Sequence, residues 1–146
     1  MRHSARLLSI LLRLVGSVAL LAVVGLLMPT AWMALCHERL GLGGLPEGPV
    51  FEYLARSTSA FYALTGGLLW VLSTDVHRYA RVITYVAVGG LFFSVAILVT
   101  DIVAALPMFW TIGETIANFG TCIAVLILQG DIRRSADTRQ EREVDS

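Results

Sequence analysis

The chain has 146 residues and a formal net charge of zero, with 56% hydrophobic and 15% charged residues. Soluble domains usually carry about 45–50% apolar and about 25% charged residues, so the composition excludes an ordinary soluble domain and favours a chain whose solvent is lipid. A zero net charge also provides no field that would attract nucleic acid. We therefore expect the lipid bilayer as a partner, and no nucleic acid.

Four segments are long and apolar enough to cross a bilayer, which takes about 20 residues of helix. They cover residues 14–35, 54–74, 82–101 and 109–128. They predict an all-α membrane fold: an antiparallel bundle of four transmembrane helices in a single domain, residues 1–130. The first segment also has the basic start of a cleaved signal peptide. Its apolar run exceeds the about 7–15 residues of such peptides, which favours a retained helix.

The arginines set the expected orientation, because basic residues concentrate in cytoplasmic loops. The N-terminus, the loop between the second and third segments, and the chain after the fourth carry most of them, whereas the opposite side carries Arg39 and Arg56. This predicts a multi-pass protein of the bacterial cytoplasmic (inner) membrane with both termini inside. The arginines expected on the inner side near the membrane are Arg2, Arg6, Arg13, Arg78, Arg81, Arg133 and Arg134.

Two connecting regions interrupt this pattern. Residues 36–53 form the longest loop, whose glycines and prolines exclude one continuous helix. Residues 131–146 are charged and nearly free of apolar side chains, so we expect a cytoplasmic tail that is disordered or a frayed extension of the last helix. Within the four segments the only proline is Pro29, near the end of the first.

Small residues recur on three of the predicted helices. Helices in lipid associate through close backbone approach, so such faces are expected to turn toward neighbouring helices. The second helix carries a repeat of four, the third a pair, and the fourth a further stripe that continues to Gly120 and Ala124. The predicted packing residues are Ala55, Ser59, Ala63, Gly67, Gly90, Ser94, Gly113 and Ala117.

Charged residues near the outer helix ends form the candidate site. Arg56 follows Glu52 by one helical turn, so the two can pair. Asp101 closes the third helix and Glu114 lies one turn into the fourth, and alternating helix directions bring them to the same outer level. We expect an outer polar cluster, either structural or able to bind a small solute or proton. Its members are Glu52, Arg56, Asp101, Glu114, Asn118 and His37.

No catalytic constellation, metal site or cofactor site is predicted. Cys36 and Cys122 are expected at different depths, so we expect no disulfide between them, and no CxxC or Cys/His pair has ligand spacing.

The stretch from residue 37 to 79, HERLGLGGLPEGPVFEYLARSTSAFYALTGGLLWVLSTDVHRY, carries a distinctive order of motifs. An H-x-x-L-G-L-G loop leads into a YLARS-type helix. This resembles a group of small bacterial four-helix membrane proteins for which no activity is established. The architecture alone is also similar to the DoxX-like set. These resemblances imply a four-helix integral membrane protein, and they imply no activity, because architecture does not determine function.

Three functions remain as hypotheses. The first is a non-enzymatic membrane protein that acts through helix packing with itself or with a membrane partner. The second is a carrier or sensor for a small solute or proton, using Arg56, Asp101 and Glu114. The third is a membrane enzyme acting on lipid or quinone, with Glu114, Asp101 and His37 as acid–base groups. Short loops and the lack of a catalytic motif favour the first.

Overall fold

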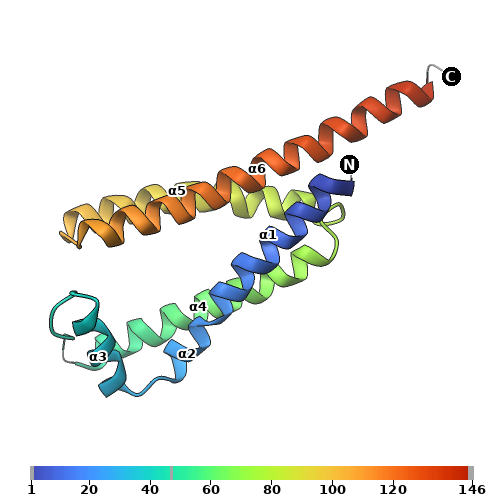
Figure 1. The fold of residues 1–146 in the computed structure, drawn as a ribbon. Helices are drawn as coiled ribbons and strands as arrows, with labels where there is room; N and C mark the ends of the chain where they lie inside the picture. Colours follow the sequence, from blue (N-terminus) through green and yellow to red (C-terminus); the bar gives the residue numbers. More distant parts are fainter. Residues whose placement is uncertain (1, 47, 145–146) are drawn as a thin grey trace. The chain divides into compact units, whose positions relative to one another are not determined.

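The computed structural model of the chain describes residues 2–46 and 48–144, and every regular element in this part is helical (Figure 1). Apolar periodicity and good helix formers produce helices here without any β-strand among the described residues. The helices are α1 (Arg2–Leu20), α2 (Ala22–Leu27), α3 (Thr30–Arg39), α4 (Pro49–Thr74), α5 (Ala80–Val103) and α6 (Met108–Val144).

Three helical stretches of the described chain are long and apolar enough to cross a membrane: His3–Leu27, Ala80–Val103 and Met108–Ser135. They correspond to the first, third and fourth predicted segments. The second predicted segment lies in α4, whose 26 residues are long enough. Its charged pair, Glu52 and Arg56, and its many hydroxyl and glycine residues make it less apolar than the other three. The count of four spanning helices therefore stays a prediction.

The first predicted segment, residues 14–35, is not one continuous helix. Leu21 separates α1 from α2 with nearly helical dihedral angles, whereas Met28 is extended, with φ −67° and ψ 133°, and ends α2. The cause is Pro29, which lacks an N–H and forces the residue before it out of the helical region. The chain restarts as α3 directly after this proline.

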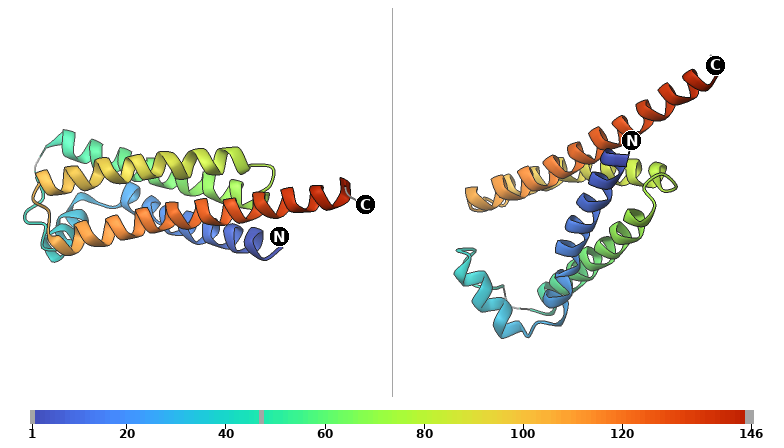
Figure 2. Two further views of the ribbon diagram at one scale, coloured as in Figure 1. Left: turned by 90° about the horizontal axis from the view of Figure 1, so that it is seen from above. Right: turned by 45° about the vertical axis from the view of Figure 1, so that its right-hand side comes forward.

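The chain forms two compact units: a central unit, Arg13–Val71, and a terminal unit, Met1–Leu12 with Leu72–Ser146. In the central unit, the latter part of α1 and α2 run beside α4 (Figures 1 and 2). Two glycines bring the backbones together, since a Cβ on Gly66 would lie 2.6 Å from the Gly16 carbonyl oxygen. A second close approach joins Gly25 to the Ser59 hydroxyl, and the Trp70 indole N–H donates to the Ser17 hydroxyl at 3.1 Å.

This seam differs in register from the predicted small-residue repeat on α4. Ser59 takes part, but Gly66 makes the closest contact, and Gly67 has no neighbour within 4 Å in its unit. Four-residue steps overshoot a helical turn by about 40°, so a repeat from Ala55 through Ala63 to Gly67 drifts about 120° around the helix. Alternating steps of four and three residues stay on one face. The contacting residues follow that rule: Glu52, Arg56, Ser59, Gly66 and Trp70.

In the terminal unit, α5 and α6 pack side by side as an antiparallel hairpin (Figure 2). Gly90 lies against the Cys122 sulfur, and Ser94, buried on the same face of α5, donates to the Gly90 carbonyl. The Arg133 guanidinium donates to the Thr84 hydroxyl at 3.1 Å. These contacts fix the register of the two helices. The predicted small-residue stripe on α6 makes no such close contact within this unit. Gly113 has no neighbour within 4 Å in its unit, and Ala117 is exposed.

A short turn joins these two helices. The N–H groups of Ala105 and Leu106 donate to the carbonyls of Ile102 and Asp101, respectively, which is the Schellman arrangement at a helix C-terminus. Ala105 occupies the left-handed position with φ 53°, where glycine is the usual residue.

The apolar core of the terminal unit gathers where the start of α1, the α4–α5 turn and the latter half of α6 meet. The Ser9 hydroxyl donates to the Ser73 carbonyl at 2.7 Å within this core. The amide of Gln129 is also buried here, and neither its oxygen nor its nitrogen has a partner among the described residues. The buried apolar side chains are Leu8, Leu12, Leu72, Val76, Ile83, Ala87, Val125 and Ile132.

The predicted tail begins inside α6, which continues as a helix to Val144. Of the two expectations for residues 131–146, disorder or an extension of the last helix, residues 131–144 follow the second as a continuation of α6; residues 145–146 lie outside the described part. The Ser135 and Thr138 hydroxyls donate to the carbonyls of Asp131 and Arg134, one turn back. The segment contains four arginines, two glutamates and one glutamine, which are good helix formers and let the helix continue without an apolar face.

Candidate functional site

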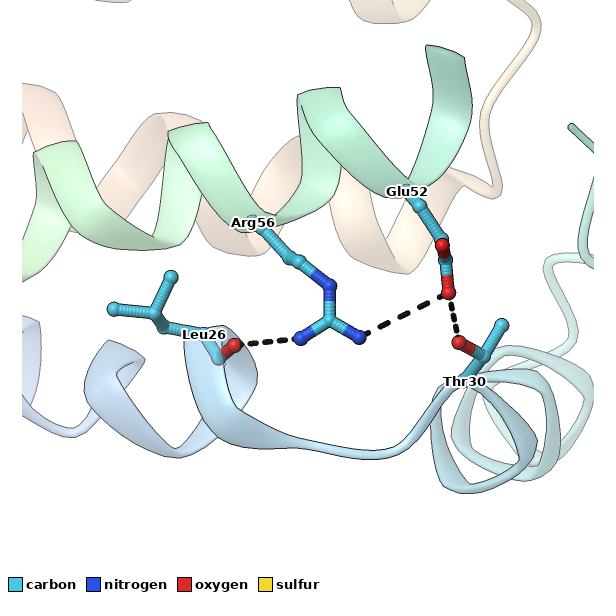
Figure 3. Close-up of polar contacts among 4 residues, drawn as sticks. All are labelled: Leu26, Thr30, Glu52 and Arg56. Carbon is cyan, nitrogen blue, oxygen red and sulfur yellow. Dashed lines mark hydrogen bonds and ion pairs between the residues drawn. The ribbon is translucent and has the colours of Figure 1, made fainter. Parts of the chain in front are cut away.

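The most developed polar site of the described chain lies at the break between α2 and α3, within the central unit (Figure 3). A carbonyl in the last turn of a helix has no helical N–H partner. Because Pro29 ends the helix, the Leu26 carbonyl is such a group. The Arg56 guanidinium reaches across from α4 and donates its Nη1–H to this oxygen at 2.8 Å. Arg56 therefore caps the interrupted helix.

Glu52 lies one turn before Arg56 and reaches the other side of the break. Its Oε1 accepts a hydrogen bond from the hydroxyl of Thr30, the first residue of α3. The same oxygen lies 3.8 Å from Arg56 Nη2, which is an ion pair at the predicted i, i+4 spacing. Together, Glu52 and Arg56 hold both chain ends that Pro29 separates. We call these four residues, Leu26, Thr30, Glu52 and Arg56, the clamp.

Typical free energies show whether the ion pair or the capping hydrogen bond contributes more to stability. An exposed i, i+4 ion pair contributes about 0.3–0.5 kcal/mol. A hydrogen bond from a charged donor contributes about 1.5–3 kcal/mol when buried, and removing it leaves an unpaired carbonyl. The Arg56 side chain is 37% exposed, so we take about 1–2 kcal/mol for its bond to Leu26. The capping bond therefore outweighs the ion pair.

His37 lies on α3 in the same unit and contacts the loop that follows this helix. Its Nδ1 lies 3.0 Å from the Gly43 carbonyl oxygen, which can only accept, so Nδ1 carries the hydrogen. Its ring meets Phe51 edge-on, with centroids 6.5 Å apart. Gly41 and Gly43 in this loop adopt positive φ angles that other residues rarely take. His37 is thus held by the loop.

The two other predicted carboxylates belong to the terminal unit. The register fixed by Gly90 and Cys122 places Asp101 opposite the first turns of α6, where Glu114 lies. Asp101 is 5% exposed, and its Oδ2 has no partner among the described residues. Glu114 is half-buried and accepts a 3.0 Å hydrogen bond from the Trp110 indole N–H. Asn118 lies half-buried one turn further along α6.

The predicted cluster is therefore distributed over both units. Asp101, Glu114 and Asn118 lie at one end of the α5–α6 hairpin, while Arg56, Glu52 and His37 belong to the central unit. A joint site of Arg56 with Asp101 and Glu114 stays a prediction. Within the described residues, no group of three or more His, Cys, Asp or Glu side chains has a geometry that could hold a metal ion.

Two members of the clamp were not among the predicted site residues. The Leu26 partner is a backbone carbonyl, which residue type does not mark, and Thr30 resembles any hydroxyl residue in an apolar segment. The available signal was Pro29, since a proline inside an apolar run leaves unpaired carbonyls in the turn before it.

Comparisons with known proteins give no match to any family model, curated protein or solved structure.

Proposed function

We propose that the chain is a multi-pass protein of the bacterial inner membrane, with four spanning helices in an antiparallel bundle and both termini in the cytoplasm. The spans are α1 with α2, then α4, α5 and α6. Twenty-six residues of α4 extend about 39 Å as a helix, enough to cross a hydrocarbon core of about 30 Å. The arginine distribution supports the orientation.

The outward display of large apolar side chains supports this placement. In the most apolar windows of the three long helices, only 11%, 17% and 11% of the residues are buried within the chain. Tyr85, Phe92 and Val103 on α5 are 79%, 75% and 80% exposed. In water such a surface would be strongly unfavourable, whereas in lipid it is the normal exterior of a helix.

Within the membrane, the protein acts through helix association, with itself or with a membrane partner. The observation that carries this proposal is the small-residue face of α6. Gly113 and Gly120 have no neighbour within 4 Å in their own unit, and Ala117 between them is exposed. Small residues that allow close backbone approach are the common basis of helix association in lipid.

Disulfide crosslinking in membranes tests the proposal. In a background with Cys36→Ser and Cys122→Ser, an Ala117→Cys variant is expected to form a crosslinked dimer or a crosslink to a partner. Ile123→Cys, on the bulky exposed face of the same helix, serves as the matched control and is expected to crosslink much less. A strict monomer for Ala117→Cys, with no partner attached, would contradict the proposal.

A second candidate function, a carrier or sensor for a small solute or proton, is favoured by one observation. A carboxylate within an apolar span is costly and is often functional, and Asp101 is buried with an unpartnered oxygen. This function predicts that uptake of protons or of a small solute by proteoliposomes containing the protein is lost in both Asp101→Asn and Glu114→Gln. Uptake that is unchanged in the two variants would exclude it.

A further inference from the structure

A pocket opens directly beside the clamp, entirely within the central unit. It lies between α3, the loop after it and the first turn of α4, and it has a volume of about 370 Å³. One end is polar, with Thr30 and Glu52, and the remaining wall is largely apolar, including Ala34, Leu45, Pro46 and Phe51. A pocket with apolar walls and a polar end matches an amphiphile, and its volume is at the low end of the about 300–1,000 Å³ of small-molecule sites.

The two charged groups of the clamp indicate the chemistry of the ligand. Glu52 lines the polar end of the pocket, and Arg56 lies one helical turn further along α4, next to Glu52 but outside the lining. Arg56 Nη2 and Glu52 Oε1 are 3.8 Å apart, beyond hydrogen-bond distance, and the two side chains are 37% and 43% exposed. A guanidinium offers five N–H donors and a carboxylate two oxygens, so each group has capacity beyond the clamp contacts (Figure 3). A positive and a negative group side by side complement a zwitterion. An anionic headgroup without an ammonium would be repelled by the negative charge of Glu52.

We propose that this pocket binds a phospholipid with a primary-amine zwitterionic headgroup. The ammonium lies on the Glu52 carboxylate, the phosphate lies toward Arg56, and the part of the lipid next to the headgroup packs on Ala34 and Phe51. A primary ammonium supplies three N–H donors, which a quaternary ammonium lacks. The inference rests on the proposed membrane placement, which puts this end of α4 at the outer interface. Trp32 and Tyr53, which follow the lining residues Ala31 and Glu52 in the chain, are exposed aromatic residues that suit that level.

Thermal unfolding of the full chain in detergent tests the proposal with four probes: short-chain phosphatidylethanolamine, phosphatidylglycerol and phosphatidylcholine, and free phosphoethanolamine. Phosphatidylethanolamine at about tenfold excess over its Kd is expected to raise the midpoint by about 3 °C or more. The other two lipids are expected to give less than a third of that shift. Equal shifts for all three lipids, or a full shift with phosphoethanolamine alone, would overturn the proposal.

Three variants test whether the phosphatidylethanolamine shift arises from binding in this pocket. Glu52→Gln removes the charge but keeps an acceptor for Thr30, and Ala34→Leu fills the pocket while leaving both charges in place. Each is expected to abolish the phosphatidylethanolamine shift, whereas Glu38→Gln, exposed on α3 and outside the pocket, retains it. A shift that survives Ala34→Leu contradicts the site even if Glu52→Gln does not fold. Crosslinking at Ala117 is measured separately. A chain that crosslinks there but does not bind this lipid overturns the lipid proposal and leaves the proposed helix association standing.

Discussion

The guanidinium of Arg56 donates a 2.8 Å hydrogen bond to the backbone carbonyl of Leu26, one turn before the proline that ends α2. A charged residue within a largely apolar helix is costly unless it meets a specific need. Here the need is created by the chain itself, because Pro29 interrupts the helix and leaves its last carbonyls unpaired. The arginine and the helix break are therefore two parts of one structural feature.

Because Arg56 caps the helix break, replacing Arg56 is expected to lower the free energy of unfolding mainly when Pro29 interrupts the helix. Arg56→Gln is expected to lower the free energy of unfolding by about 1–2 kcal/mol, because Leu26 loses a charged donor. Arg39→Gln, exposed at the end of α3, is expected to change it by less than about 0.5 kcal/mol. In a Pro29→Ala background, Arg56→Gln should cost clearly less. Additive effects of the two substitutions in a double-mutant cycle would contradict the cap.

Neighbouring glycines on α4 provide an internal comparison of the helix seam. Gly66→Ala is expected to destabilise the protein by about 1–3 kcal/mol, since the new Cβ would lie 2.6 Å from the Gly16 carbonyl oxygen. A Cβ on Gly67 would have no neighbour within 4 Å in its unit. Gly67→Ala is therefore expected to be neutral or to stabilise by up to about 1 kcal/mol through helix propensity. Unfolding midpoints of the two variants check this, and the reverse order would show that the seam follows the four-residue repeat.

The contact between Gly90 and Cys122 makes a similar prediction for the α5–α6 hairpin. A Cβ on Gly90 would lie 2.7 Å from the Cys122 sulfur, so Gly90→Ala is expected to destabilise by about 1–2 kcal/mol. Removing the sulfur with Cys122→Ala should recover most of that loss in the double variant. Thermal unfolding of the four proteins measures the coupling, and a coupling near zero would place the two residues apart.

The turn between α5 and α6 contains a residue that is not the best one for its conformation. Ala105 has φ 53°, a left-handed position that costs a non-glycine residue about 1 kcal/mol or more. Ala105→Gly is expected to raise the free energy of unfolding by about 0.5–1 kcal/mol, after the greater flexibility of glycine in the unfolded chain is subtracted. A higher unfolding midpoint is the expected result; a lower one would argue against the Schellman turn.

The sequence predicted the presence of the helices better than their contacts. Long apolar runs predict α1, α5 and α6 because a helix satisfies its own backbone groups and needs no partner to be recognised. The i, i+4 spacing of Glu52 and Arg56 was likewise sufficient to predict their pairing. Both features depend only on neighbours along the chain, which residue types describe directly.

Features that depend on packing were harder to predict. The choice of Gly66 over Gly67 depends on the drift of a four-residue repeat around the helix, which a list of small residues does not show. The Leu26 group that accepts a hydrogen bond from Arg56 is a backbone carbonyl, which has no residue-type signature. The helical continuation of α6 to Val144 follows from helix propensity without an apolar face, whereas low hydrophobicity alone suggested disorder as one alternative.

Native Cys36 allows the most direct test of the central claim, that the chain spans the membrane with both termini inside. Cys36 is free and exposed on α3, beyond the first long apolar helix. In a Cys122→Ser background, an impermeant maleimide added to spheroplasts is expected to label Cys36. In a background without native cysteines, Ser135→Cys should react only after the membrane is permeabilised. Protection of Cys36 with labelling of residue 135, or equal labelling of both in intact spheroplasts, would contradict the account.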